Sequence, residues 1–196
     1  IPTDGSVTSI GDCAFNGCSG LTSITIPDSV TSIGNEAFND CSGLTLITIP
    51  SSVNSIGERV FEKCSSLEKI EVASRNTKYH SSGNCLIETA TKTLIFGCKT
   101  SVIPTDGNVT SIGRFAFYDC SGLTSITIPD GVTSIGDCAF SGCINLKITC
   151  KATTPPSLGY LVFPNDVTIY VPAESVEAYK NADGWKDFAD KIQAIA

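Results

Sequence analysis

The sequence has no methionine, one histidine and one tryptophan among its 196 residues. Because an initiator methionine is missing and the first residues fall inside a repeated phrase, we expect a fragment whose signal or anchor lies outside it. No apolar run approaches the roughly 20 residues needed to cross a bilayer. The first residues also lack the basic and apolar regions of a signal peptide. We therefore predict no membrane insertion within this fragment.

Positive charge is scarce and scattered. The chain has 20 acidic and 13 basic residues, a net charge of -7, and residues 1–50 contain five acidic residues and no basic one. Residues 58–99 are mildly basic, with seven Lys or Arg against five acidic residues. No run of Lys or Arg follows a pattern that would track a phosphate backbone. We therefore expect no nucleic-acid partner.

Motifs for catalysis and for cofactors are also missing. His80 is the single histidine, near Ser81 and Ser82, and nothing in the pattern supplies a third group to orient a nucleophilic pair. We interpret it as a surface-loop residue. The sequence has no phosphate-binding glycine loop and no EF-hand loop, and its cysteines lack the C-x-x-C spacing of zinc sites. We predict a protein that is not an enzyme and uses no metal or cofactor.

What the sequence does contain is a phrase that recurs at a regular interval. Phe15, Phe38 and Phe61 follow one another at a constant step of 23, and the same step separates Phe117 from Phe140. A Cys and a Leu, three and six positions after each of these Phe residues, keep this spacing. Such a period is typical of leucine-rich repeats, in which each coil contributes one short parallel strand and buries its apolar face by stacking. The repeated residues then line the core, whereas the variable residues face water.

The run from Ile26 to Pro50 resembles the BspA-like leucine-rich repeat of bacterial and protozoan surface proteins. It reads I-P-x-x-V-x-x-I-G-x-x-A-F-x-x-C-x-x-L-x-x-I-x-I-P, and at least eight of these positions recur together in the other units. The tail from Thr168 to Phe188 is similar to the C-terminal cap of such proteins in gut Bacteroides-type bacteria. The resemblance implies a secreted or cell-surface protein that attaches to host matrix proteins or to other microbes.

We predict an α/β repeat solenoid, a right-handed leucine-rich repeat superhelix with a parallel strand ladder. In "CLIETATKTLIFGC", from Cys85 to Cys98, apolar residues flank a polar centre, which indicates a β-hairpin. We expect it to replace the outer part of one coil; the alternative is a hinge between two subdomains. The expected divisions are repeats over residues 1–71, an irregular repeat with the hairpin over 72–102, repeats over 103–151 and a C-terminal cap over 152–196.

The cap is predicted from its own pattern. A strand from Val167 to Val171 is followed by Pro172 at the start of a helix. The apolar residues Trp185, Phe188, Ile192 and Ile195 form a second stripe. The end of a solenoid exposes an apolar face that must be covered, so we assign Trp185 to packing rather than to binding.

Ten cysteines invite a disulfide interpretation. Neighbouring side chains of a stacked column point the same way, however, so we expect free, buried thiols that act as small apolar residues. Cys85 and Cys98 flank the hairpin and remain a possible pair. The column consists of Cys18, Cys41, Cys64, Cys120 and Cys143.

A binding surface is expected where side chains point outward between the inward apolar positions of the ladder. We call this side, which leucine-rich repeats form into a concave surface, the strand face. It is small, hydroxylated and nearly uncharged apart from one coil. Its candidate binding residues are Ser23, Thr25, Leu46, Thr48, Lys69, Glu71, Ser125 and Thr127.

Two functions fit these features best. The first is a non-catalytic recognition or adhesion module that binds a host matrix or microbial surface protein, through the strand face or through residues 72–102. The alternative is a structural spacer that projects another domain from the cell, which the near-identical units of residues 1–50 favour. A third hypothesis, ice binding through regular threonine rows, is disfavoured because Leu46 and Lys69 interrupt the rows.

Overall fold

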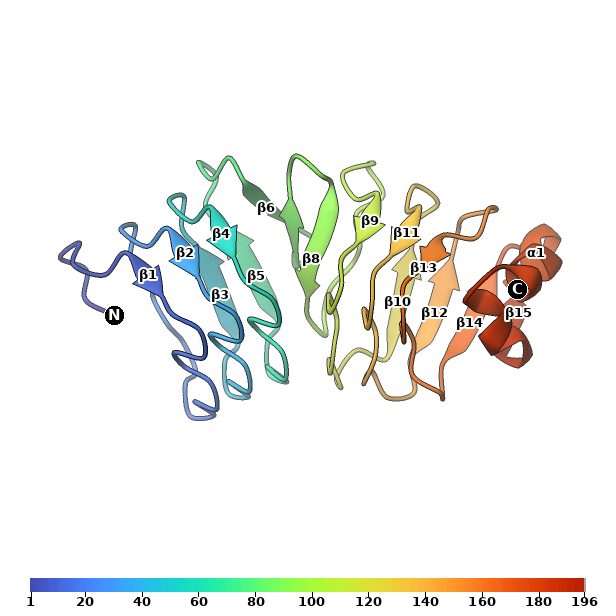
Figure 1. Ribbon diagram of the computed structural model, residues 1–196, viewed down its shortest axis with the longest axis horizontal. Coiled ribbons are helices and arrows are strands. Elements are labelled where there is room, and N and C mark those ends of the chain that lie inside the picture. Colours follow the sequence, from blue (N-terminus) through green and yellow to red (C-terminus); the bar gives the residue numbers. More distant parts are fainter. Residues whose placement is uncertain (196) are drawn as a thin grey trace.

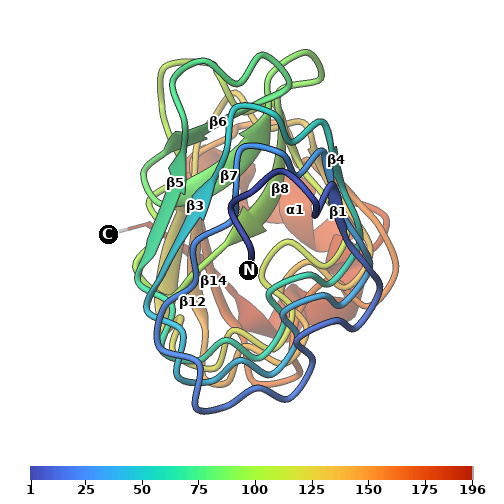
Figure 2. The same cartoon turned by 90° about the vertical axis from the view of Figure 1, so that its left-hand side faces the viewer.

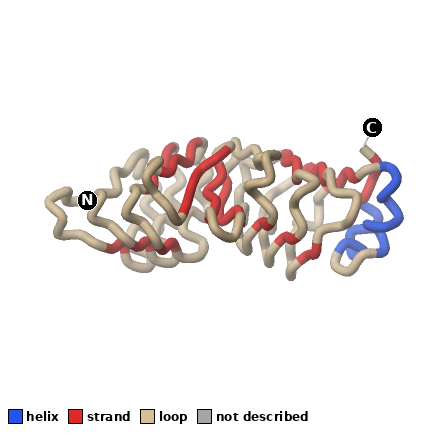
Figure 3. The backbone as a smooth tube through the Cα atoms, turned by 90° about the horizontal axis from the view of Figure 1, so that it is seen from above, coloured by secondary structure: helices blue, strands red, loops and turns tan. Residues whose placement is uncertain are grey.

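The computed structural model describes residues 1–195 and is an elongated stack of coils with the two termini at opposite ends (Figure 1). Most regular coils carry two short strands, and these stack into two parallel ladders on opposite sides of the coil (Figure 2). Helix is confined to the C-terminal end (Figure 3). The predicted repeat solenoid with a parallel strand ladder is confirmed.

The first ladder is the one that the sequence predicts. Its strands alternate buried and outward residues, so that Ile47 and Ile49 are fully buried and Thr48 is exposed, which is the period of a half-buried strand. The strands are β3 (Leu46–Ile49), β5 (Lys69–Val72), β10 (Ser125–Ile128), β12 (Lys147–Cys150), β14 (Thr168–Val171) and β15 (Ile192–Ala194). They form two separate sheets, β3-β5 and β10-β12-β14-β15.

The second ladder was not predicted as strands, because each of its members is only two residues long. Five of the six are Ser-Ile pairs, and in most of them the Ile is buried. These strands are β1 (Ser9–Ile10), β2 (Ser32–Ile33), β4 (Ser55–Ile56), β9 (Ser111–Ile112), β11 (Ser134–Ile135) and β13 (Ser157–Leu158). We call this the Ser-Ile ladder.

Stacked aromatic rings run through the core of both halves. The ring centroids of Phe15 and Phe38 are 5.2 Å apart, with planes only 2° from parallel, and those of Phe117 and Phe140 are 5.1 Å apart. Trp185 ends the second stack, 5.3 Å from Phe163. A position that recurs once in every repeat therefore meets its own equivalent in the next coil, as the sequence predicts.

The predicted hairpin is confirmed, but its location is not the one we expected. β6 (Tyr79–Ser82), β7 (Cys85–Glu88) and β8 (Thr93–Gly97) pair antiparallel, and β8 then pairs parallel with β9. β7 crosses the interior between the two ladders instead of replacing the outer part of a coil (Figure 2).

β7 is buried on both faces. Leu86 packs into an N-terminal core that includes Phe38 and Phe61. Cys85 and Ile87, on the opposite face, pack into a C-terminal core. The strand therefore separates two hydrophobic cores, whereas the hinge between subdomains stays a hypothesis.

The C-terminal elements cover the last coil. They are a 3-10 helix (Ala173–Ser175), α1 (Val176–Asn181), a second 3-10 helix (Trp185–Lys191) and β15. Trp185 is fully buried and its indole N–H donates to the Pro156 carbonyl at 2.7 Å. The predicted cap and the packing role of Trp185 agree with this arrangement, although Ile192 lies in a strand parallel to β14 rather than on a helix.

All ten cysteines are free thiols. In the repeated column Cys41, Cys64 and Cys143 are buried, Cys18 is exposed in the first coil, and Cys120 is half-buried. Cys85 and Cys98 do not pair, because their side chains belong to the two different cores.

Candidate functional site

The structure divides the predicted strand-face residues into two groups. Leu46 lies opposite Lys69 and Thr48 opposite Glu71 in the β3–β5 register. Ser23 and Thr25 lie outside any strand, but they line the same open hollow of about 410 Å³ as Leu46 and Thr48. These residues form one continuous N-terminal patch.

The second group lies on the C-terminal half. Ser125 faces Lys147, and Thr127 faces Thr149 across the β10–β12 pair. Two short segments, the turn after β6 and residues 100–103, lie between β5 and β10 and separate this group from Glu71. The two segments are joined to each other by a hydrogen bond of 2.8 Å from the Val102 N–H to the Gly83 carbonyl. The eight candidates therefore do not form one unbroken row.

The C-terminal half of the strand face contains residues that the sequence reasoning missed. Lys147, Thr149 and Tyr170 continue the rows of Ser125 and Thr127. These five, together with residues 101–103, line an open hollow of about 430 Å³. The signal was available, because "KITC" and "TIYV" repeat the strand pattern of "SITI".

Two apolar groups accompany the hydroxyls at this hollow. Val102 is 69% exposed, and Tyr170 is half-buried. Aromatic residues such as tyrosine are enriched where proteins bind one another. The C-terminal hollow therefore has both apolar contact area and hydrogen-bonding groups.

The only ion pair among the eight candidates joins Lys69 to Glu71, with a nitrogen–oxygen distance of 2.6 Å. The Lys69 ammonium lowers the pKa of Glu71 by a hydrogen bond and by its charge, and the Thr48 hydroxyl adds a weaker contact at 3.4 Å. Both side chains are well exposed, so solvent screens the pair. The ion pair therefore contributes little stability, and its two charged groups are accessible to a partner.

The structure places His80 on β6, not in a surface loop. Its ring Nδ1 lies 3.0 Å from the Thr89 hydroxyl, and no acidic side chain contacts it among residues 1–195. Within the same residues, no group of three or more His, Cys, Asp or Glu side chains gathers as a metal site. The strand-face residues offer contact surface and hydrogen-bonding groups.

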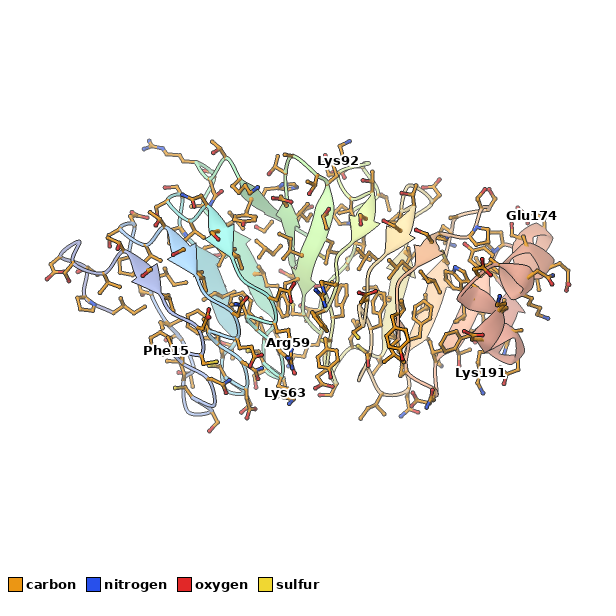
Figure 4. All side chains as sticks on the ribbon, in the orientation of Figure 1. Phe15, Arg59, Lys63, Lys92, Glu174 and Lys191 are labelled. Atoms are coloured by element: carbon orange, nitrogen blue, oxygen red, sulfur yellow. The ribbon has the colours of Figure 1, made fainter. Side chains whose placement is uncertain are left out.

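A charged cluster at the junction of the two halves also escaped the sequence reasoning. Glu62 is 2% exposed and receives Arg59 Nε at 2.5 Å and the Asn39 amide at 3.3 Å. Lys63 lies between Glu62 and Asp119, at 3.7 and 3.8 Å. Arg59 and Lys63 are labelled in Figure 4, below β5.

A family model for the BspA type leucine rich repeat region matches residues 1–106 and 96–165, with six copies. The chain belongs to the BspA-type leucine-rich repeat family. No curated protein matches this BspA-type chain at a significant level.

Solved structures give the same fold. A leucine rich cell surface protein from Faecalibacterium prausnitzii is 28% identical, with a TM-score of 0.63 over 100% of this chain. The pneumococcal vaccine antigen PcpA is 16% identical, with a TM-score of 0.56 over 96% of this chain and 69% of its own. A leucine-rich repeat protein from Eubacterium ventriosum is 24% identical, with a TM-score of 0.50 over 85% of this chain and 65% of its own. This BspA-type chain spans 58% of the length of the Faecalibacterium protein.

The family is consistent with a protein-interaction module, and the Faecalibacterium relative is described as a cell surface protein. Of the helices in residues 1–195, none has the length and apolar character to span a bilayer.

Proposed function

We propose that this protein is a non-catalytic recognition module of a bacterial cell surface, which binds a host matrix or microbial surface protein through the strand face. The observation that carries the proposal is the hollow at β10, β12 and β14, where Tyr170 and Val102 flank a row of hydroxyl groups and Lys147. Solenoids use such faces to bind extended protein partners. The description of the Faecalibacterium relative supports the location.

The two halves of the strand face differ in what they offer a partner. The N-terminal patch has one charged pair, Lys69 and Glu71, one apolar side chain, Leu46, and otherwise small hydroxylated side chains. The C-terminal hollow combines an aromatic ring, an exposed aliphatic group and an ammonium group. Because aromatic anchors carry a large share of interface energy, we place the main contact at Tyr170 and the secondary contact at Lys69 and Glu71.

The test is binding of the purified protein to immobilised host matrix proteins and mucins at physiological salt. We expect saturable binding to at least one of them, weakened about tenfold by Tyr170→Ala, which corresponds to loss of roughly 1.4 kcal/mol. A Lys69→Ala, Glu71→Ala variant should weaken binding less. Lys186→Ala, on the exposed surface of the cap, is the charge-matched control and should leave binding unchanged.

Two results would contradict the proposal. Saturable binding that survives both strand-face variants would place the contact elsewhere, with residues 72–102 as the next region to examine. An absence of binding across the panel would make the structural spacer the leading function.

A further inference from the structure

The coil that contains β8 is shorter than its neighbours at one corner. Leu94 occupies the place of Ile112 in the adjacent coil, because its carbonyl accepts the Gly113 N–H at 2.8 Å, as the Ile33 carbonyl accepts from Gly57. Gly97 occupies the place of Phe117, because its N–H donates to the Ala116 carbonyl. Two residues lie between Leu94 and Gly97, whereas four lie between Ile112 and Phe117.

The missing two residues leave an open hollow of about 270 Å³ between the corners of the coils on either side. We call this hollow the notch. One wall is the corner from Gly57 to Val60, the other is the corner from Gly113 to Phe115, and the floor includes Leu86, Ile95 and Phe96. Its lining is mainly apolar, unlike the hydroxylated strand face.

The two walls present backbone groups that are hydrogen-bonded wherever two regular corners stack on each other. At regular corners, the residue with a left-handed backbone donates its N–H to a carbonyl of the next coil, as Glu36 does to Glu58 at 2.9 Å and Phe115 to Asp137 at 2.9 Å. Arg59 has the same backbone conformation, with φ of 57°. Its N–H has no partner within residues 1–195.

The opposite wall lacks the complementary bond. Asn35, Glu58 and Asp137 each accept a hydrogen bond at their carbonyl from the preceding coil. Arg114 is the equivalent residue beside the notch, and among the described residues nothing donates to its carbonyl. Within residues 1–195, one wall of the notch therefore has an unpaired backbone donor, the Arg59 N–H, and the other has an unpaired acceptor, the Arg114 carbonyl. The space between them is the place that the corner of one coil would fill.

The charged side chains at the notch are already paired. Arg114 Nη1 lies 3.2 Å from Glu58 Oε1 across the rim, and both side chains are 53% exposed. Arg59 contacts Glu62 at 2.5 Å and Glu36 at 3.2 Å. An anionic ligand would have to displace these carboxylates, so the site favours an uncharged occupant. Because the exposed Arg114–Glu58 ion pair contributes little stability, an uncharged occupant can displace it at little cost in free energy.

These features identify the chemistry of the occupant. At each regular corner, a peptide backbone fills this place and forms both hydrogen bonds. We infer that the notch binds a short peptide segment of a partner protein, which carries one large apolar side chain between small residues. The segment's carbonyl accepts the Arg59 N–H, its N–H donates to the Arg114 carbonyl, and its apolar side chain fills the hollow above Ile95 and Leu86. This site is separate from the strand face and does not depend on the function proposed there.

The backbone geometry of the corners favours small residues on both sides of the apolar residue of the bound segment. The corner residues Cys13, Glu36, Arg59, Phe115 and Cys138 all have positive φ, a conformation that glycine adopts without steric cost. A segment of the form glycine–apolar–glycine enters such a corner more readily than one with branched neighbours. The sequence preference of the notch is therefore one apolar side chain between glycines.

The test uses blocked tripeptides and the intact chain. The probe is acetyl-Gly-Leu-Gly-amide, titrated while backbone amide chemical shifts are recorded by NMR. We expect saturable binding with a Kd near or below about 1 mM and a shift of the Arg59 amide signal. Acetyl-Gly-Asp-Gly-amide, which lacks the apolar group, and the analogue with N-methylated glycines, which lacks two N–H groups, should bind at least tenfold more weakly.

An Ile95→Trp variant, which fills the notch, should lose at least tenfold in affinity for the leucine probe. Ile144→Trp is the matched control, because Ile144 is 58% exposed and does not line the notch. The probe comparison uses the wild-type protein, so it does not depend on the folding of either variant. Equal binding of the three probes, or no saturable shift, would overturn the proposal.

Sedimentation at rising protein concentration distinguishes the source of the occupant. A single species at all concentrations agrees with a segment of a different protein. A dimer that forms with concentration and disappears in Ile95→Trp would place a second copy of this chain in the notch, which contradicts the assignment to a partner protein.

Discussion

Single side chains decide how closely adjacent coils approach. The ring of Phe117 lies where a Cβ on Gly97 would be, so a glycine is required at that point. In the cysteine column, the thiols of Cys41, Cys64 and Cys143 donate to the carbonyl of a Phe in the preceding coil at 3.0 to 3.1 Å. A cysteine there is small, apolar and a weak donor, which explains its use where other leucine-rich repeats have Leu.

The buried thiols predict an alkaline loss of stability. Burial raises the pKa of Cys64 and Cys85 from 9.0 to about 12, and that of Cys41 to about 11. At pH values between 9 and these raised pKa values, the thiols of the unfolded chain are deprotonated, whereas the same thiols stay protonated in the folded chain. The free energy of unfolding therefore falls as pH rises above 9, by about 1.4 kcal/mol per pH unit for each such thiol.

Urea unfolding under reducing conditions at pH 7, 9 and 10.5 measures this effect. Cys64→Ala should show a shallower decline than the wild type, because one titrating thiol is removed. Cys13→Ala, which removes an exposed thiol, is the matched control. Identical slopes in the two variants would refute the assignment of the decline to buried cysteines.

At the scale of elements, β7 determines how the two halves of the solenoid meet. Its alternate residues enter different cores, with Leu86 on the N-terminal side and Ile87 on the C-terminal side. The antiparallel pairs β6–β7 and β7–β8 supply the backbone hydrogen bonds that a regular coil would take from its neighbours. The same diversion shortens the corner at Ile95 and Phe96 and produces the notch.

Substitutions on the two faces of β7 should therefore act on different halves. Leu86→Ala and Ile87→Ala should each cost about 2–5 kcal/mol of unfolding free energy, because both side chains are fully buried. Hydrogen exchange should accelerate most in β3 and β5 for Leu86→Ala, and in β9 and β10 for Ile87→Ala. Thr89→Ala, an exposed site in the adjacent turn, is the control, and indistinguishable exchange patterns would argue against two separate cores.

At the scale of the whole molecule, stability comes from stacking and from closure of the end. Each coil buries its apolar face only against its neighbours, and the C-terminal stack of rings ends on Trp185. Tyr179 packs edge to face against Trp185 at 4.8 Å and donates its hydroxyl to the Ala152 carbonyl at 2.8 Å. The cap thus covers the last core layer with both apolar contact and hydrogen bonds.

Removal of the capping ring should destabilise the C-terminal coils first. We expect Trp185→Ala to lower the free energy of unfolding by about 3–5 kcal/mol and to expose the amides of β14 and β15 to hydrogen exchange before those of β3. Lys186→Ala, at the next, exposed residue, should change stability by less than about 0.5 kcal/mol. A loss below about 1 kcal/mol for Trp185→Ala would contradict its capping role.

The candidate binding surface was partly accessible from sequence. The alternation of strand residues correctly places Thr48 and Thr127 on the outward side, because side chains of a strand alternate between faces. The sequence does not indicate Tyr170 as a surface residue, because its strand is followed directly by the cap, although in the structure the strand continues the register of β12. Whether these residues contact a partner stays a prediction.

The sequence by itself determined the stack of coils, the order of the apolar columns and the antiparallel hairpin. The constant repeat length places each inward residue against its equivalent, and apolar runs around a polar turn pair with each other. Only the tertiary structure decided that β7 lies between two cores and that one corner is two residues short. The consecutive apolar residues Cys85, Leu86 and Ile87 indicate a strand buried on both faces, but which core each face enters depends on the coils packed against it. The notch also depends on the tertiary structure, because two coils that are distant in sequence form its walls. The residues of neither wall show that the corner between them is two residues shorter.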